Sequence, residues 1–382
     1  MSDAAGRPGG AVRKRAGLAR RLRRGAVALL AAFALLAAFG HAGAQDKPGV
    51  IRIGAPSMVT EKDNYYGSLG IARYKGWLDE EFAKDGIRIQ LVGYRGGAPL
   101  VGQALANGQI DFAWQGDMLS LIGKSSGVKS RIVLPMSRLS NAYLAVAPGS
   151  PIKSIKDLRG KRVSYAKGNQ IQLQVIRILA ANGMSERDIR SVALDAATAS
   201  AALASGDVDA VFGGADLIAL RDRGLARIVY STRGQAVDAT SFNSLLVHED
   251  FARKYPQVVE RLVKVLVRSL HWASQPQNVD EVFRIWSLGG PAVSRYYVKE
   301  DFQGRPLPHY LSPLFDPLYV EHYRRTQETL VDLKLLRGRK VDVERWIDRR
   351  YLDRALAQLG LQDYWPKLDA GGRPVAANVA AK

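Results

Sequence analysis

The sequence predicts an α/β protein with two similar lobes, each built around a doubly wound sheet. Two observations support this class. Strands and helices alternate in two separate parts of the chain, which is typical of mostly parallel sheets. A sixteen-residue phrase also occurs twice with seven identities, as ALANGQIDFAWQGDML from Ala104 to Leu119 and as ALASGDVDAVFGGADL from Ala202 to Leu217. The copies lie farther apart than the ~20–50 residues of a solenoid repeat, so we interpret them as equivalent parts of two lobes.

The first lobe reads as three strands that alternate with two helices. Apolar spacing and Gly-containing stops predict a strand at 51–54, a helix over 65–84, a strand at 87–92, a helix that ends at Asn107-Gly108 and a strand at 110–114. The repeated phrase is therefore predicted to form the end of a helix, a Gly stop, a buried strand and a Gly-containing turn.

The second lobe repeats this scheme. Its expected elements are a short helix at 154–158, a strand at 161–165, a helix at 171–182, a strand at 189–194, a helix at 198–205 and a strand at 208–212. Two further segments that favour strands, 143–146 and 242–247, bracket this lobe. We interpret them as hinge strands by which the chain leaves the first lobe and returns, which makes the sheets mixed.

The remaining chain is predicted to be helical and to complete the first lobe. Pro256 is placed at the start of a helix with one apolar face, and more helices are expected at 318–336 and 343–359. The predicted organisation is a leader at 1–44, a discontinuous first lobe at 45–143 and 246–370, a second lobe at 144–245 and a flexible tail at 371–382.

The first 44 residues have the three parts of a secretory signal peptide. Eight Lys or Arg are followed by fourteen consecutive apolar residues at 26–39 and by the small residues Ala42-Gly43-Ala44. A membrane-spanning helix needs ~20 apolar residues, so we expect cleavage after Ala44, with an uncleaved anchor as the alternative. Arginine pairs in the leader leave twin-arginine export open beside the Sec route.

Composition excludes several kinds of function. The formal net charge of +19 falls to +12 without the leader, which carries eight bases and one Asp. The bases are scattered except at Arg337–Lys340 and no nucleic-acid motif accompanies them, so we expect a solvated basic surface and no nucleic-acid partner. The chain has no Cys, which excludes thiolate chemistry. Its five His lack metal-site spacing, so we expect no metal.

Candidate ligand-binding residues lie at the predicted carboxyl ends of strands, where open α/β sheets bind ligands. Glycine there lets backbone amides approach a ligand, and helix starts favour anions. The candidates at these ends are Gly97, Ala98, Gln115, Gly116 and Asp117 in the first lobe, and Lys167, Gly168, Asn169, Gln170, Gly213, Gly214 and Asp216 in the second. Tyr65 and Tyr66, which follow the loop after the first strand, are candidates for a pocket wall. The alternative for each glycine is a turn between a strand and a helix without contact to a ligand.

Two passages resemble a known family. GGAPLVGQALANGQIDFAWQGDML and SPIKSIKDLRGKRVSYAKGNQIQLQVIRILAANGMSERDIRSVALDAATASAALASGDVDAVFGG are similar to the periplasmic solute-binding proteins of sulfonate, nitrate and taurine ABC importers. The resemblance runs from about Ile51 to about Trp365.

The resemblance implies a type II periplasmic binding-protein fold that clamps a small solute between its lobes. It further implies a periplasmic monomer that needs no cofactor, performs no catalysis and delivers an anion such as a sulfonate or nitrate to an inner-membrane permease with its ATPase. Two stretches depart from the family pattern. Small residues replace an aromatic residue after GDVDA, and Lys167-Gly168-Asn169-Gln170 lacks the usual hydroxyl. A larger or less charged solute is therefore an alternative ligand.

Two other functions remain open on the same fold. One is an enzyme, because the resemblance extends at lower specificity to a sulfinate desulfinase and a thiamine-pyrimidine synthase. The desulfinase type uses a Cys nucleophile and the synthase type a His-rich site with a Cys cluster, and neither is visible in this sequence. The other is a sensory binding protein that docks on a receptor instead of a permease.

Overall fold

The computed structural model describes residues 47–56, 67–94, 97–234, 237–289, 299–304 and 306–375. The predicted signal peptide, Tyr65 and Tyr66 lie outside these residues. In the described part of the chain, no helix has the length and apolar character needed to cross a membrane.

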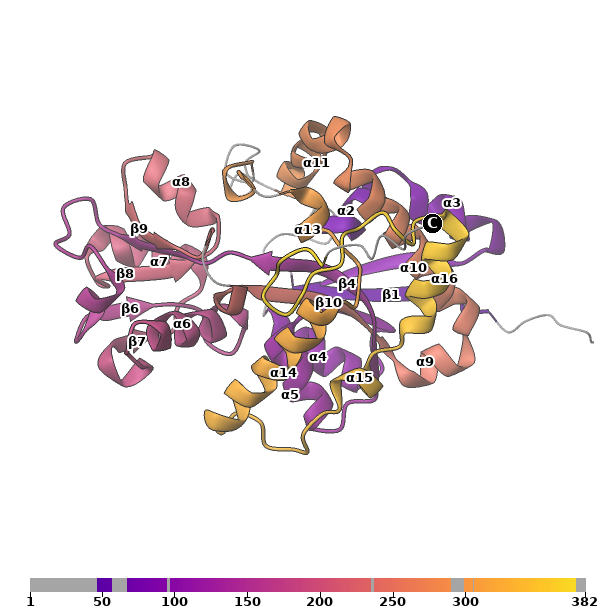
Figure 1. The fold of residues 1–382 in the computed structure, drawn as a ribbon, viewed down its shortest axis with the longest axis horizontal. Coiled ribbons are helices and arrows are strands. Elements are labelled where there is room, and N and C mark those ends of the chain that lie inside the picture. The colour runs from indigo at the N-terminus through magenta and orange to yellow at the C-terminus, as the bar shows by residue number, and fades with distance from the viewer. Residues whose placement is uncertain are drawn as a thin grey trace, which may run out of the picture. The chain divides into compact units, whose positions relative to one another are not determined.

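The first lobe contains a mixed five-stranded sheet (Figure 1). Its elements before the crossing are β1 (Val50–Pro56), α2 (Gly67–Tyr74), α3 (Trp77–Phe82), β2 (Arg88–Tyr94), α4 (Ala98–Ala106), β3 (Phe112–Gly116), α5 (Asp117–Ser125) and β4 (Ser130–Ser140). After the return they are β10 (Ser241–His248), α9 (Glu249–Lys254), α10 (Pro256–Ser274), α11 (Val279–Trp286), α13 (Leu307–Tyr310), α14 (Pro317–Asp332), α15 (Val343–Trp346) and α16 (Arg349–Leu359).

The second lobe contains another mixed five-stranded sheet, flanked by helices. Its elements are β5 (Tyr143–Val146), β6 (Arg162–Ser164), α6 (Gln170–Ala181), β7 (Arg190–Val192), α7 (Ala196–Ser205), β8 (Ala210–Gly213), α8 (Asp216–Asp222) and β9 (Arg227–Ser231). Short 3-10 helices occur at Ala83–Asp85, Ile155–Leu158, Glu186–Asp188, Val237–Ala239, Pro276–Asn278 and Ser287–Gly289.

The two sheets have the same topology. The strand order is β2-β1-β3-β10-β4 in the first sheet and β7-β6-β8-β5-β9 in the second. In each sheet four strands run in one direction, and the fourth position holds the one antiparallel strand, β10 or β5. The predicted doubly wound, mixed α/β class is confirmed.

The repeated phrase forms an equivalent Asp–Arg contact in both lobes. Asp111 accepts hydrogen bonds from the backbone and guanidinium of Arg52 on β1, with Arg52 Nη2 at 2.7 Å. Asp209 binds the backbone and guanidinium of Arg162 on β6 in the same way, with Arg162 Nη2 at 2.9 Å. The repeated Asp therefore ties the strand of the phrase to the start of its parallel neighbour.

Side-chain alternation builds the core of the second lobe. On β5, Leu144 and Val146 enter one buried cluster, while Tyr143 and Ala145 enter another on the opposite side of the sheet. Successive side chains of a strand point to opposite faces, so a strand covered on both sides is apolar throughout.

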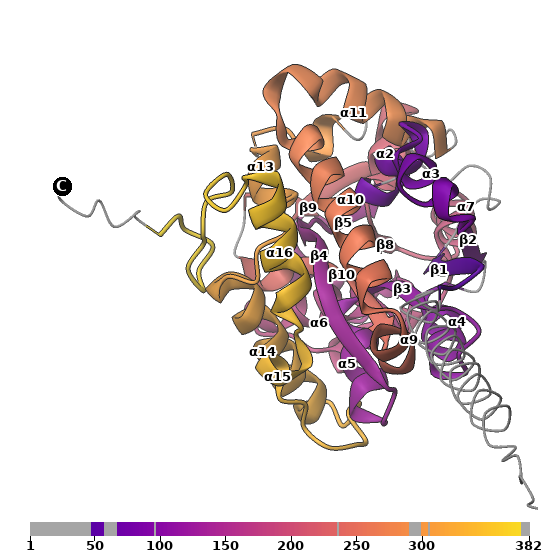
Figure 2. The same ribbon diagram turned by 90° about the vertical axis from the view of Figure 1, so that its right-hand side faces the viewer.

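The core of the first lobe is one large cluster that includes the apolar face of α10. This helix begins at Pro256, as predicted, and buries Val258, Leu262 and Leu266. Figure 2 shows α10 beside α16, with which it packs. The late helices thus complete the first lobe.

The lobes are joined by residues 141–142, between β4 and β5, and by residues 232–240, between β9 and β10. The strand β5 lies wholly within the second sheet, and β10 lies wholly within the first. The predicted lobe boundaries at 144 and 246 therefore fall inside these strands and not between the lobes. We place the hinge at the two connections.

Candidate functional site

A cavity of about 560 Å³ lies where α4 of the first lobe meets the strand ends of the second lobe. The first lobe contributes Gly97, Ala98 and Pro99. The second lobe contributes residues from the carboxyl ends of β6, β7 and β8 and from the segments that follow them. Carboxyl ends of parallel strands are the usual ligand-binding edge of such sheets, and the volume is in the range of small-molecule sites.

Half of the fourteen candidate residues line this cavity. They come from both lobes, and they are Gly97, Ala98, Lys167, Asn169, Gly213, Gly214 and Asp216. The glycine turns of the two lobes therefore border one space.

Four other candidates lie beside the cavity wall. Gln115 is buried and its Nε2 donates to the Ala98 carbonyl at 3.1 Å, which supports the start of α4 from behind. A Cβ on Gly116 would come within 2.7 Å of Gln170 Oε1, so this glycine makes room for a side chain of the other lobe. The Gly168 amide donates to Gln172 Oε1 at 2.8 Å.

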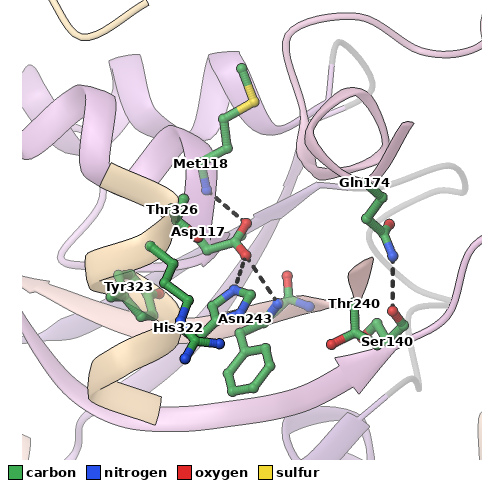
Figure 3. Close-up of polar contacts among 12 residues, drawn as sticks. Asp117, Met118, Ser140, Gln174, Thr240, Asn243, His322, Tyr323 and Thr326 are labelled. Atoms are coloured by element: carbon green, nitrogen blue, oxygen red, sulfur yellow. Dashed lines mark hydrogen bonds and ion pairs between the residues drawn. The ribbon is translucent and has the colours of Figure 1, made fainter. Parts of the chain in front are cut away.

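Asp117 lies instead in a sealed polar cluster (Figure 3). Its side chain is 0 % exposed. One carboxylate oxygen accepts from the Met118 amide at 2.7 Å, and the other accepts from the Phe242 amide at 3.3 Å and from His322 Nε2 at 2.5 Å. Burial lowers the pKa of His322, and the Asp117 carboxylate opposes this change. This arrangement joins α5, β10 and α14 in the first lobe.

The second lobe reaches this cluster through α6. Arg177 Nη2 donates to Thr326 Oγ1 of α14 at 2.9 Å, and burial lowers the pKa of Arg177 while Asp117 opposes that change. Gln174 Nε2 donates to the Ser140 carbonyl at 2.9 Å, at the end of β4. The cluster is therefore a junction between the lobes.

Positive potential in the cavity comes from the Lys167 side chain and from the start of α4. Lys167 Nζ donates to Ser191 Oγ at 2.8 Å and is otherwise exposed. Gly97, whose φ of 78° suits glycine, directly precedes α4, and this helix has no side-chain cap. The Gly97 amide donates to the Tyr94 carbonyl at 2.9 Å and Pro99 has no N–H, so the amide that this helix start directs to an anion in the cavity is that of Ala98. Asn169 caps α6 by accepting from the Ile171 amide.

Two carboxylates balance this potential. Asp195 accepts from the amides of Ala197 and Thr198, so it already occupies the start of α7. Asp216 accepts from the Gly214 amide at 3.0 Å, and burial raises the pKa of its carboxyl. The wall therefore disfavours an anion more strongly when Asp216 is ionised.

Sequence reasoning missed the apolar part of the wall, which includes Tyr165, Ile171, Leu194 and Phe212. It also missed Asp195. A detectable signal existed for Asp195, because it follows a predicted strand and precedes a helix, where Asp is a preferred cap. The apolar residues carried no such signal, because core and cavity side chains look alike in sequence.

Comparison with known proteins places the chain in a family. A model of the NMT1/THI5-like family matches residues 64–279, more than half of the sequence. The chain belongs to the NMT1/THI5-like family.

Relatives of this NMT1/THI5-like protein include binding proteins matched over nearly their full length. A Bacillus subtilis protein assigned to aliphatic-sulfonate binding is 26% identical over 348 residues, covering 88% of this chain and 98% of the relative. A crystal structure from Methylobacillus flagellatus, assigned as the periplasmic sulfonate-binding protein of a sulfonate ABC transporter, has 28% identity and a TM-score of 0.73, covering 86% of this chain and 98% of that one. The predicted periplasmic binding-protein fold is confirmed.

The same fold also occurs in an enzyme. A structure of the desulfurization enzyme DSZB aligns with a TM-score of 0.65 and 19% identity, covering 81% of this chain and 99% of that one. At this identity the likeness concerns the fold alone. Function in the NMT1/THI5-like protein must therefore be argued from its own cavity.

Proposed function

We propose that the protein is the periplasmic solute-binding component of an ABC importer, and that it captures a small organic anion of the sulfonate class. The observation that carries this proposal is the convergence of α4 of one lobe and three strand ends of the other on one cavity. Lys167 and the Ala98 amide at the start of α4 supply a charge and a donor for an anionic head group.

The apolar wall supports an organic body on that anion. Tyr165 and Phe212 are at most 2 % exposed and border the cavity with Ile171 and Leu194. A hydrocarbon chain gains about 25 cal/mol for each Å² of apolar surface that it buries. Nitrate has no apolar surface and would leave most of the cavity to water.

Binding without catalysis is the role that the wall supports. Among the described residues that line the cavity there is no Ser, Thr, His or Cys, so this part of the wall offers no Ser, Thr or Cys nucleophile paired with a His base. The named relatives matched over most of their length are binding proteins. We place the protein in the periplasm as a monomer that delivers its solute to a permease with its ATPase.

A ligand screen tests this function. We expect alkane-1-sulfonates to raise the melting temperature of the mature protein, because a ligand that binds only the native state at ~100 times its Kd adds about 2.7 kcal/mol of stability. Taurine and sodium nitrate serve as comparison solutes, and sodium chloride controls for ionic strength. Stabilisation by nitrate alone, or by no sulfonate at all, would refute a sulfonate ligand.

Asp216 predicts how binding responds to pH. Because the pKa of Asp216 is raised, its carboxyl takes up a proton as pH falls and loses the charge that repels an anion. We expect sulfonate affinity to rise on acidification, by about tenfold for an interaction of ~1.4 kcal/mol. The Asp216→Asn variant, which lacks this charge, is expected to bind at every pH with the affinity that wild type reaches only at acidic pH.

Isothermal calorimetry between pH 4 and 8 measures both effects, with Asp207→Asn as the control because Asp207 is exposed outside the cavity wall. An identical pH profile in wild type and Asp216→Asn would remove Asp216 from the binding electrostatics.

A further inference from the structure

Residues 299–304 contact both lobes. On the first-lobe side, the anchor is Phe302, which is 5 % exposed. Its ring centroid lies 4.4 Å from that of Tyr310, edge to face, and 5.4 Å from that of Trp286. These aromatic contacts place the segment firmly on the first-lobe core, since such pairs add to the burial of their apolar area.

The same segment binds the second lobe through Glu300. Its two carboxylate oxygens accept from Arg221 Nη1 at 2.6 Å and from Arg221 Nη2 at 2.7 Å. The Glu300 carbonyl accepts from Arg233 Nη1 at 2.8 Å. The Arg221 guanidinium holds the pKa of Glu300 below its usual range, so the pair is ionised at neutral pH. Bidentate ion pairs of this kind fix the relative orientation of the two side chains as well as the distance between them.

Asp301 adds a second contact at the hinge. Its Oδ1 accepts from the Tyr143 hydroxyl at 2.6 Å and from Asn141 Nδ2 at 2.8 Å. Asn141 belongs to one connection between the lobes, and Tyr143 begins β5. Neighbouring acids on one short segment therefore hold two different parts of the second lobe.

The position of Arg221 links this contact to the cavity. Arg221 lies near the end of α8, and Asp216, at the start of the same helix, lines the cavity together with Gly213 and Gly214. At 1.5 Å per residue, about 7.5 Å of rigid helix separates the two points. A rotation of α8 away from Glu300 would therefore displace this wall of the cavity.

We propose that Glu300 and Asp301 are positioning residues for ligand binding, which hold α8 and the cavity wall of the second lobe against the first lobe. The proposal rests on the assignment of this cavity as the solute site. Arg177 and Gln174 join the lobes through a different helix, α6. Loss of the Glu300 contact would leave the second lobe free to pivot about those contacts and the two connections.

Spin labels can measure this restraint directly, because the chain has no native Cys. Cysteines at the exposed positions Ala204 on α7 and Ala357 on α16 place one label on each lobe. We expect Glu300→Ala to shift or broaden the distance distribution between the labels in the ligand-free protein. We also expect it to weaken the binding of butane-1-sulfonate by about fivefold.

A matched control and a rescue separate positioning from general stability. Glu281→Ala removes another bidentate ion pair, which Glu281 forms with Arg284 within α11 of the first lobe. This control is expected to leave both the distances and the affinity unchanged. The conservative variant Glu300→Asp, which keeps the carboxylate, is expected to retain part of both.

The proposal is overturned if Glu300→Ala has the distance distribution of the wild type, if Glu281→Ala changes it equally, or if distances change without any change in affinity. Should wild type fail to bind butane-1-sulfonate or any other screened sulfonate, the proposed ligand class fails. The ligand-free distances then decide by themselves whether Glu300 restrains the lobes.

Discussion

The Asp316→Ala variant is expected to lose about 3–5 kcal/mol of its free energy of unfolding. Arg138 Nη1 donates to both oxygens of Asp316 at 2.8 Å, and both side chains are 0 % exposed. Burial already lowers the pKa of Arg138. Without Asp316, the guanidinium would stay buried with no counter-charge, which costs more than the loss of the contact alone.

Asp316 also organises the backbone around the pair. It caps α14 by accepting from the Tyr319 amide at 3.1 Å, and it accepts from the Leu368 amide at 3.0 Å. Its removal therefore loosens β4, the start of α14 and the C-terminal segment together.

Urea unfolding followed by tryptophan fluorescence measures the loss. The control is Asp250→Ala, which breaks an exposed pair with Arg253 and is expected to cost no more than about 1 kcal/mol. Replacing both partners, with Arg138→Met and Asp316→Leu, is expected to recover part of the loss because no buried charge remains. A change below 1 kcal/mol in Asp316→Ala would contradict this account of the pair.

The Ala166→Trp variant is expected to lose sulfonate binding by about a hundredfold or more while remaining folded. Ala166 follows β6 and lines the cavity, so an indole at this position occupies space needed by the solute. Overfilling a packed space typically costs ~1–3 kcal/mol through forced movement of neighbours. A ligand excluded from the site loses its apolar contacts as well.

Calorimetry with the tightest sulfonate of the screen checks this prediction, and circular dichroism checks the fold. Ala204→Trp is the matched control, because Ala204 is exposed on α7 and does not line the cavity. Equal affinities in the two variants would mean that the solute binds elsewhere.

Local patterns predicted most elements of the fold. The helix expected at 171–182 is α6 at Gln170–Ala181, and the strand expected at 87–92 is β2 at Arg88–Tyr94. The long helix expected over 65–84 divides within its described part into α2, α3 and a 3-10 helix, with Gly76 at a φ of 71° between α2 and α3. Apolar spacing continues through such a break, since one glycine hardly changes the periodicity.

The strand β4 was missed for a physical reason. Pro135 and Arg138 interrupt its apolar pattern, although the strand is largely buried. Arg138 is tolerated there only because Asp316 neutralises it from 178 residues away. No local pattern can indicate a partner at that distance.

In the candidate site, too, local patterns predicted some residues and tertiary packing decided others. Strand ends followed by glycine predicted the edge of the sheet that borders the cavity, including Gly97 and Gly213. Asp117 occupies the same kind of position in sequence, but tertiary packing seals it against His322, which lies 205 residues away.

The sequence alone determined which lobe plan the chain adopts, because hydrophobic periodicity and the repeated phrase are local properties of the chain. Tertiary structure alone decided which strand-end residues border the shared cavity and which are sealed in the lobe junction. It also decided which acid binds which arginine between the lobes. Those outcomes depend on groups far apart in the chain that meet only when both sheets have formed, and their free energies depend on burial that no single segment possesses.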